Sequence, residues 1–68
     1  MKQLRIRQRV RVNTLGGVTL EGVLVSKRGG FITLAAPKVE KDGELVEVTG
    51  SIYVPRSNVE FIQAVGGV

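Results

Sequence analysis

The sequence contains no cysteine, no histidine and no tryptophan among its 68 residues. Without cysteine and histidine the chain lacks thiol nucleophiles, imidazole general bases and the ordinary ligands of zinc. It also lacks the disulfides and metal sites that stabilise many domains of this size, which bury only about 60% of the surface that the unfolded chain exposes. We therefore expect a non-enzymatic protein without a metal, a cofactor or a small-molecule substrate, stabilised by self-association.

Long apolar segments are absent as well. Charged and apolar residues alternate over residues 1–8, so this region has no apolar block of signal-peptide length. No apolar run elsewhere in the sequence is long enough to span a bilayer. We expect one domain over residues 1–68, located in the cytoplasm and not associated with a membrane.

Positive charge is unevenly distributed along the chain, whose formal net charge is +4. Residues 1–34 contain seven lysine and arginine residues and a single carboxylate, Glu21, whereas residues 35–68 contain three cationic and five acidic residues. This asymmetry is typical of a polyanion-binding face. It is equally typical of contacts between oppositely charged surfaces of identical subunits.

Apolar residues with a period of two, separated by turn residues, predict β-strands throughout the chain. Glycines inside two of these strands, Gly22 and Gly50, predict bends or close backbone approaches. Pro37 predicts the end of the third strand or an edge position, and Asp42-Gly43 predicts a hairpin turn. The expected strands cover residues 4–13, 18–26, 31–36, 44–54 and 59–65. Together they predict an all-β fold, a small five-stranded, strongly bent antiparallel barrel of SH3-like or OB-like type.

Four arginines share one parity of the first predicted strand, while apolar residues occupy the other. Such a row has a spacing of about 6.6 Å, close to that of successive phosphates in an extended single strand, and therefore predicts a track for a nucleic-acid backbone. The same row is also typical of a solvated face that discourages aggregation, or of one that pairs with acidic residues of a neighbour. Its members are Arg5, Arg7, Arg9 and Arg11.

A second basic feature is the turn formed by Lys27, Arg28, Gly29 and Gly30. The two glycines permit positive φ angles and let main-chain N–H groups approach an anion closely. Phe31, which follows, is one of three aromatic residues and is either a platform for stacking on a base or a part of the core. The turn predicts an anion-binding loop, although the same four residues also suit an ordinary hairpin.

The order of these residues resembles the Sm and LSm family over about residues 10–62. The first family motif is matched by Val10, Val12, Leu15, Gly17, Gly22 and Leu24, and the second by Val54, Asn58, Val59 and Ile62. The resemblance implies the Sm-like fold and a ring of five to eight subunits, in which the fourth strand of one subunit pairs with the fifth strand of the next. For that interface we expect Ile52, Tyr53, Val54, Phe61 and Ile62.

The sequence differs from the family pattern at its functional positions. Lys27 or Arg28, and Phe31 or Ile32, stand where the family carries the Asp and Asn of its nucleotide pocket. Pro55-Arg56 replaces the Arg-Gly of the second motif. We expect no N-terminal helix of the kind usual in the family, because only a few residues precede the first predicted strand and their pattern is typical of β-structure.

The resemblance implies a non-catalytic, homo-oligomeric ring that binds single-stranded RNA. Phosphate contacts are expected from Lys27, Arg28 and Arg56, with Gly29 in the same loop and Phe31 stacking on a base. Asn58 either contacts a base or fixes its own turn. Two alternatives stay open at this point: a structural or protein-interaction ring whose arginine row pairs with acidic residues, and a monomeric SH3-like accessory domain.

Overall fold

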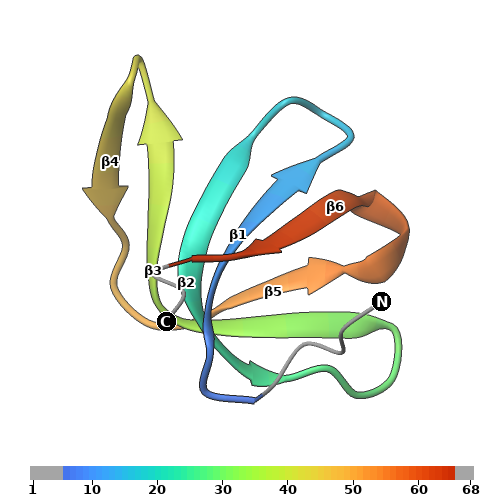
Figure 1. Cartoon of the computed structure of the whole chain (residues 1–68). Helices are drawn as coiled ribbons and strands as arrows, with labels where there is room; N and C mark the ends of the chain where they lie inside the picture. The colour runs from blue at the N-terminus through green and yellow to red at the C-terminus, as the bar shows by residue number, and fades with distance from the viewer. Residues whose placement is uncertain (1–5, 66–68) are drawn as a thin grey trace.

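The computed structural model describes residues 6–65 and shows an all-β protein in this range (Figure 1). The single helical segment among these residues is a three-residue 3-10 turn. The described residues contain no helix that is long and apolar enough to cross a bilayer. The elements are β1 (Arg9–Thr14), β2 (Thr19–Ser26), β3 (Phe31–Lys41), β4 (Glu44–Glu47), β5 (Ile52–Pro55), η1 (Arg56–Asn58) and β6 (Val59–Ala64). These bounds confirm the predicted all-β architecture.

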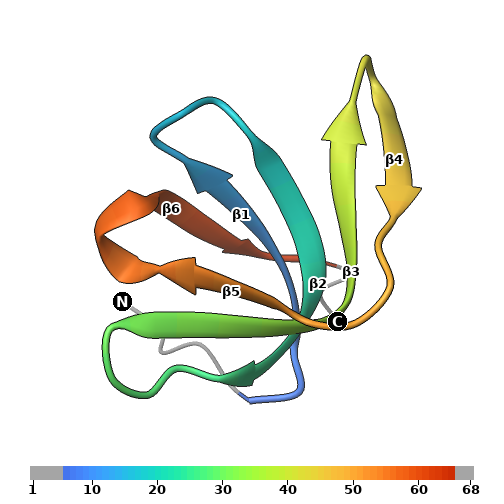
Figure 2. The same cartoon turned by 180° about the vertical axis from the view of Figure 1, so that it is seen from behind.

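All strand pairs are antiparallel, and they form one sheet in the order β4-β3-β2-β1-β6, with β5 paired to β3. The long strand β3 has two partners on its other side: its first half pairs with β5 and its second half with β4. Consequently the β3–β4 hairpin stands apart from the rest of the sheet in both views (Figures 1 and 2). The sheet is therefore strongly bent, as in an Sm-like fold.

The bend lies where β2 meets the middle of β3. Gly22 stands opposite two residues of β3, Ala36 and Pro37, which form a β-bulge, and Ala36 has a φ of 47°. A Cβ atom at Gly22 would lie 3.0 Å from the Ala35 carbonyl oxygen and 3.3 Å from the Pro37 Cα, so only glycine permits this approach. The close approach predicted at Gly22 is confirmed.

Three predicted strand limits are wrong. The first strand begins at Arg9 because residues 6 and 7 form a turn, in which Arg7 has a φ of 71°; residues 1–5 lie outside the described part. The third strand continues past Pro37 because the bulge removes this residue from the ladder with β2. The fourth strand is divided into β4 and β5 by residues 48–51, where Gly50 has a φ of 91°.

The hairpin turn predicted at Asp42-Gly43 is confirmed. Asp42 and Gly43 connect β3 to β4 with φ angles of 53° and 82°, the pair of positive angles that a type I′ hairpin requires. The turn between β1 and β2 is held by Thr14, whose buried hydroxyl donates to the Val18 carbonyl and accepts from the Val18 N–H. These turns fix the register of both hairpins.

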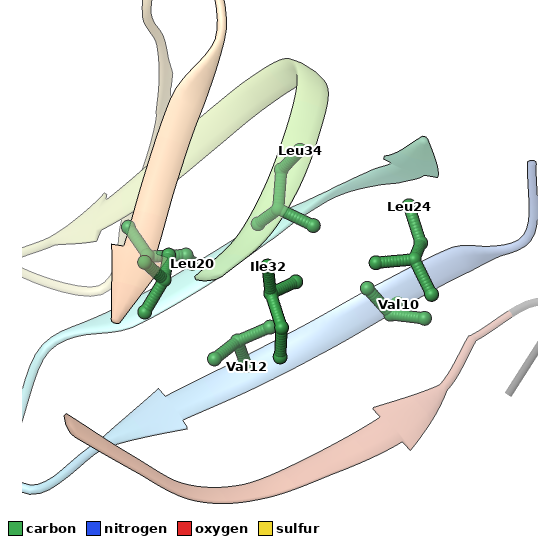
Figure 3. Packing of buried hydrophobic residues seen from close by; sticks show 7 residues of the cluster. Val10, Val12, Leu20, Leu24, Ile32 and Leu34 are labelled. Atoms are coloured by element: carbon green, nitrogen blue, oxygen red, sulfur yellow. The ribbon is translucent and has the colours of Figure 1, made fainter. Parts of the chain in front are cut away.

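The core is a single cluster on the concave side of the sheet (Figure 3). The apolar parity predicted for the first strand faces this cluster, because Val10 and Val12 are both buried. Four partly buried residues pack against the cluster: Val39, Ile52, Val59 and Ile62. The buried members are Val10, Val12, Leu20, Leu24, Ile32, Leu34 and Val54.

Candidate nucleic-acid interface

The turn between β2 and β3, residues 27–30, forms a compact loop that we call the basic loop. The Phe31 N–H donates to the Arg28 carbonyl oxygen at 3.3 Å, and the Arg28 N–H donates to Ser26 Oγ at 3.4 Å. Gly29 has a φ of 64°, a conformation that glycine adopts without steric cost. The loop is thus folded by its own main chain, while its lysine and arginine supply positive charge.

Arg56 joins the basic loop from a distant part of the sequence. Its guanidinium Nη2 donates a hydrogen bond to the Lys27 carbonyl oxygen, and its main-chain N–H donates to the Gly30 carbonyl oxygen at 2.8 Å. The start of η1 is therefore fixed against the loop. The structure thus brings together Lys27, Arg28 and Arg56, the three residues from which phosphate contacts are expected.

Phe31 and Asn58 lie at the margins of this site. Phe31 is 48% exposed and pairs with Pro55 at the start of β3, so the core position considered for it is wrong and its ring is accessible for stacking. Asn58 is also exposed, but its carbonyl oxygen accepts the Leu15 N–H at 2.9 Å. Asn58 is thus tied to the β1–β2 turn, whereas Arg56, at the other end of η1, is tied to the basic loop.

The predicted row of four arginines does not form in the described part of the chain. Arg5 lies outside that part, and Arg7 lies in the turn before β1, where its N–H donates to the Leu24 carbonyl oxygen at 2.5 Å. Arg9 and Arg11 share a face of β1, and both approach the buried carboxylate of Glu21 at 3.6 and 3.1 Å. The arginines that were considered as partners of a neighbour's acidic residues thus pair with a carboxylate of their own chain.

Glu21 was not among the predicted site residues, although the sequence contains a signal for it. Arg11 and Glu21 stand directly opposite each other in the β1–β2 register. They are equally far in sequence from Gly16, which lies in the turn. A hairpin centred on this turn places them as cross-strand neighbours, where opposite charges attract.

The predicted interface residues belong to two strands with free edges. Within residues 6–65, β5 pairs only with β3, and β6 pairs only with β1. Tyr53 on β5 is 67% exposed and Phe61 on β6 is 49% exposed, whereas Ile52 and Ile62 pack against the core. The Val54 side chain lies in the core, so its part in an interface would come from its main chain.

A cavity of about 280 Å³ lies at the bend, beside the middle of β3, whereas the basic loop precedes the start of that strand. Its charged lining residues are Arg9, Lys38 and Glu47, and its apolar ones include Pro37. Because Arg9 already approaches Glu21, and Glu47 adds a negative charge, the lining does not concentrate positive charge as the basic loop does.

Three features together define an Sm-like fold: the bent six-stranded sheet, the hydrogen bonds between the β2–β3 loop and the turn before β6, and the free edges of β5 and β6. No family model matches the sequence, and no curated protein does. Solved structures match: the chain is 27% identical to SmAP1 of P. aerophilum, a heptamer, with 91% of this chain and 84% of that chain covered and a TM-score of 0.80.

Two further solved structures are similar. The Sm protein of Pyrococcus abyssii, in complex with a uridine heptamer, is 27% identical over 87% of this chain and 84% of that chain, with a TM-score of 0.77. A chain of the NatC complex bound to CoA is 21% identical over 97% and 91% of the two chains, with a TM-score of 0.78, and this likeness shows the fold alone. The chain thus has the Sm-like fold and is similar to archaeal Sm proteins, as its motifs indicated.

Proposed function

We propose that this protein assembles into a ring of identical subunits and binds single-stranded RNA through its basic loops, without catalysis. The observation that carries the proposal is the contact of Arg56 with the basic loop, which gathers three cations at one place in each subunit. Two similar proteins support it: P. aerophilum SmAP1 is a heptamer, and the P. abyssii protein is seen in complex with a uridine heptamer.

The free edges of β5 and β6 support the assembly. An unpaired edge exposes main-chain donors and acceptors, and pairing β5 of one subunit with β6 of the next would satisfy both edges at every interface of a closed ring. Exposed Tyr53 and Phe61 lie on these edge strands and would be buried by the pairing. We expect five to eight subunits in such a ring, seven being the number in the P. aerophilum protein.

The structure does not favour the alternative of a structural or protein-interaction ring that binds no RNA. It relied on an arginine row that pairs with acidic residues of other molecules, but Arg9 and Arg11 already pair with Glu21 of their own chain. The cations of the basic loop lie elsewhere, at the opposite end of β2 from the β1–β2 turn.

Native mass spectrometry or light scattering tests the assembly. We expect a single species of five to eight subunits for the natural chain, and smaller species when Tyr53→Ser and Phe61→Ser are combined, because these changes remove the apolar contacts of both edge strands. The matched control is Leu45→Ser combined with Val46→Ser, two exposed apolar residues of β4, which should leave the mass unchanged. A monomeric natural chain would overturn the ring.

RNA binding is tested separately, by fluorescence anisotropy with single-stranded RNA at several salt concentrations. Binding that depends on phosphates should weaken with salt, with a log-log slope of about −0.7 for each phosphate contact. A ring that binds no RNA even at low salt would refute the RNA-binding half of the proposal and leave the assembly standing.

A further inference from the structure

The outer edge of β4 is unpaired in the described part of the chain, where β4 lies at the end of the sheet and pairs with β3 alone. The Val48 N–H donates to the Pro37 carbonyl oxygen at 3.0 Å, so these two residues form a hydrogen-bonded pair of the antiparallel ladder. Because such pairs alternate with non-hydrogen-bonded ones, the N–H and C=O groups of Leu45 and Glu47 point away from β3. These main-chain groups are available to a further strand.

This edge lacks the features that usually prevent an edge strand from pairing with another chain, which are lysine, proline or a bulge. The sequence of β4 is ELVE, and its ladder with β3 is regular. Leu45 and Val46 are exposed, as is Val48, which follows the strand. Both views show the β3–β4 hairpin standing apart from the rest of the sheet (Figures 1 and 2). The edge and its apolar side chains are thus accessible to a partner.

The two glutamates of β4 carry charge that the described part of the chain leaves unpaired. In the ladder with β3, Glu44 stands opposite Lys41. Glu47 stands opposite Lys38. Among residues 6–65, however, neither carboxylate forms an ion pair with a lysine or an arginine. Their charge is therefore available to a cationic partner.

Charge also excludes two other occupants of the edge. The hairpin of residues 38–47 contains four carboxylates and two lysines, so a polyanion such as RNA is disfavoured there. A second copy of β4 is disfavoured as well. In antiparallel register, Glu44 of one copy would stand opposite Glu47 of the other at both ends, and like charges directly opposite each other are destabilising.

We propose that the β4 edge binds an extended peptide segment of a protein partner, with the pattern cation, apolar, apolar, cation. The two cations stand opposite Glu44 and Glu47, and the two apolar residues stand opposite Leu45 and Val46. Main-chain hydrogen bonds with Leu45 and Glu47 supply affinity, and the side-chain pairs supply selectivity, as in other peptides that add a strand to a sheet edge.

The peptide site is separate from the basic loop. The basic loop precedes the start of β3, whereas the β3–β4 turn follows the end of that strand. Peptide binding at β4 therefore requires neither RNA nor the pairing of β5 with β6. A failure of the proposed RNA-binding function would leave this inference standing, and the reverse also holds.

The first test is an NMR titration of the natural chain with the capped peptide Ser-Thr-Lys-Val-Ile-Lys-Thr-Ser. We expect the amide signals of Leu45 and Glu47 to shift and their hydrogen exchange to slow, whereas the signal of Gly16, in the β1–β2 turn, should not move. The matched peptide with glutamate in place of both lysines should not bind. Binding of both peptides or of neither would overturn the proposal. So would β4 signals that shift with protein concentration alone, because a second copy would then occupy the edge.

A second test compares two variants of the edge main chain with the same lysine peptide. Leu45→Pro removes an outward N–H, a change that an edge strand tolerates, and should abolish peptide binding. Leu45→Thr keeps this N–H and should retain most of the binding. If Leu45→Pro binds the peptide as tightly as Leu45→Thr does, the peptide does not pair with the main chain of β4 and the proposal is wrong.

A third test concerns charge and does not depend on the folding of the proline variant. Glu47→Gln should weaken binding of the lysine peptide by about two- to fivefold, the effect of losing one cross-strand charge pair. Glu60→Gln, at an exposed position of β6, removes the same charge from the chain and should leave the affinity unchanged. Equal affinities of the two variants would contradict recognition of the peptide's cations by β4.

Discussion

The two groups of cations in this protein, one on β1 and one around the basic loop, have different surroundings. On β1, Arg9 and Arg11 approach the buried carboxylate of Glu21, so that their charge is compensated within the chain. In the site around the basic loop, the Arg56 guanidinium donates to a carbonyl oxygen, which is a neutral acceptor and leaves the charge available. Availability for a polyanion thus depends on the cross-strand neighbours of a cation more than on the number of cations in a stretch of sequence.

The largest effect should come from the basic loop. Lys27→Ala combined with Arg28→Ala should weaken RNA binding by about tenfold or more at physiological salt and make the salt dependence shallower, because two phosphate contacts per subunit are lost. Anisotropy at several salt concentrations measures both quantities. Lys38→Ala combined with Lys41→Ala, on β3, removes the same charge and should have a much smaller effect. Equal losses in the two double variants would mean that net charge alone governs binding.

An intermediate effect on RNA affinity should follow when the ion pairs of Arg9 and Arg11 with Glu21 are removed. Glu21→Gln keeps the size of the side chain and removes its charge, so Arg9 and Arg11 become available to phosphates. We expect tighter RNA binding with a steeper salt dependence, because each additional phosphate bound by these arginines steepens the log-log slope by about 0.7. The control is Glu60→Gln on β6, which changes net charge equally at an exposed position. If both variants bind alike, the pairing with Glu21 does not restrain the arginines.

The smallest effect should appear in stability rather than in binding. Arg11→Gln removes the 3.1 Å hydrogen bond to Glu21 and should lower the free energy of unfolding by about 1 kcal/mol, since Arg11 is partly exposed while the carboxylate is buried. RNA affinity should stay unchanged. Urea denaturation at a fixed protein concentration measures the loss, and Lys41→Gln, beside the Asp42-Gly43 turn, serves as the control. A reduced RNA affinity in Arg11→Gln would place Arg11 in the binding surface.

Local patterns sufficed for much of the fold. Alternation identified the inward residues of β1 to β3, and the glycines in the sequence indicated both the close backbone approach at Gly22 and the Asp42-Gly43 turn. The limits of strands were less predictable. Arg7 and Ala36 both adopt positive φ angles that their residue types do not favour, so tertiary contacts impose these conformations and no local signal announces them.

The candidate site was predicted only in part for the same reason. The basic loop and Arg56 were identified from residue types and from the family resemblance, and the structure brings them together. Parity, however, shows which residues share a face and not which residue stands opposite on the next strand. The partner of the β1 arginines therefore depended on the register of the β1–β2 hairpin, which a one-residue change in the turn would alter.

The three residues of η1 have a consequence for stoichiometry. They connect β5 directly to β6, and both of these strands have an unpaired outer edge in the described part of the chain. The angle between these edges is consequently fixed within one subunit. In a closed ring every subunit is rotated against the last by the same angle, so this short connection would determine how many copies complete the circle.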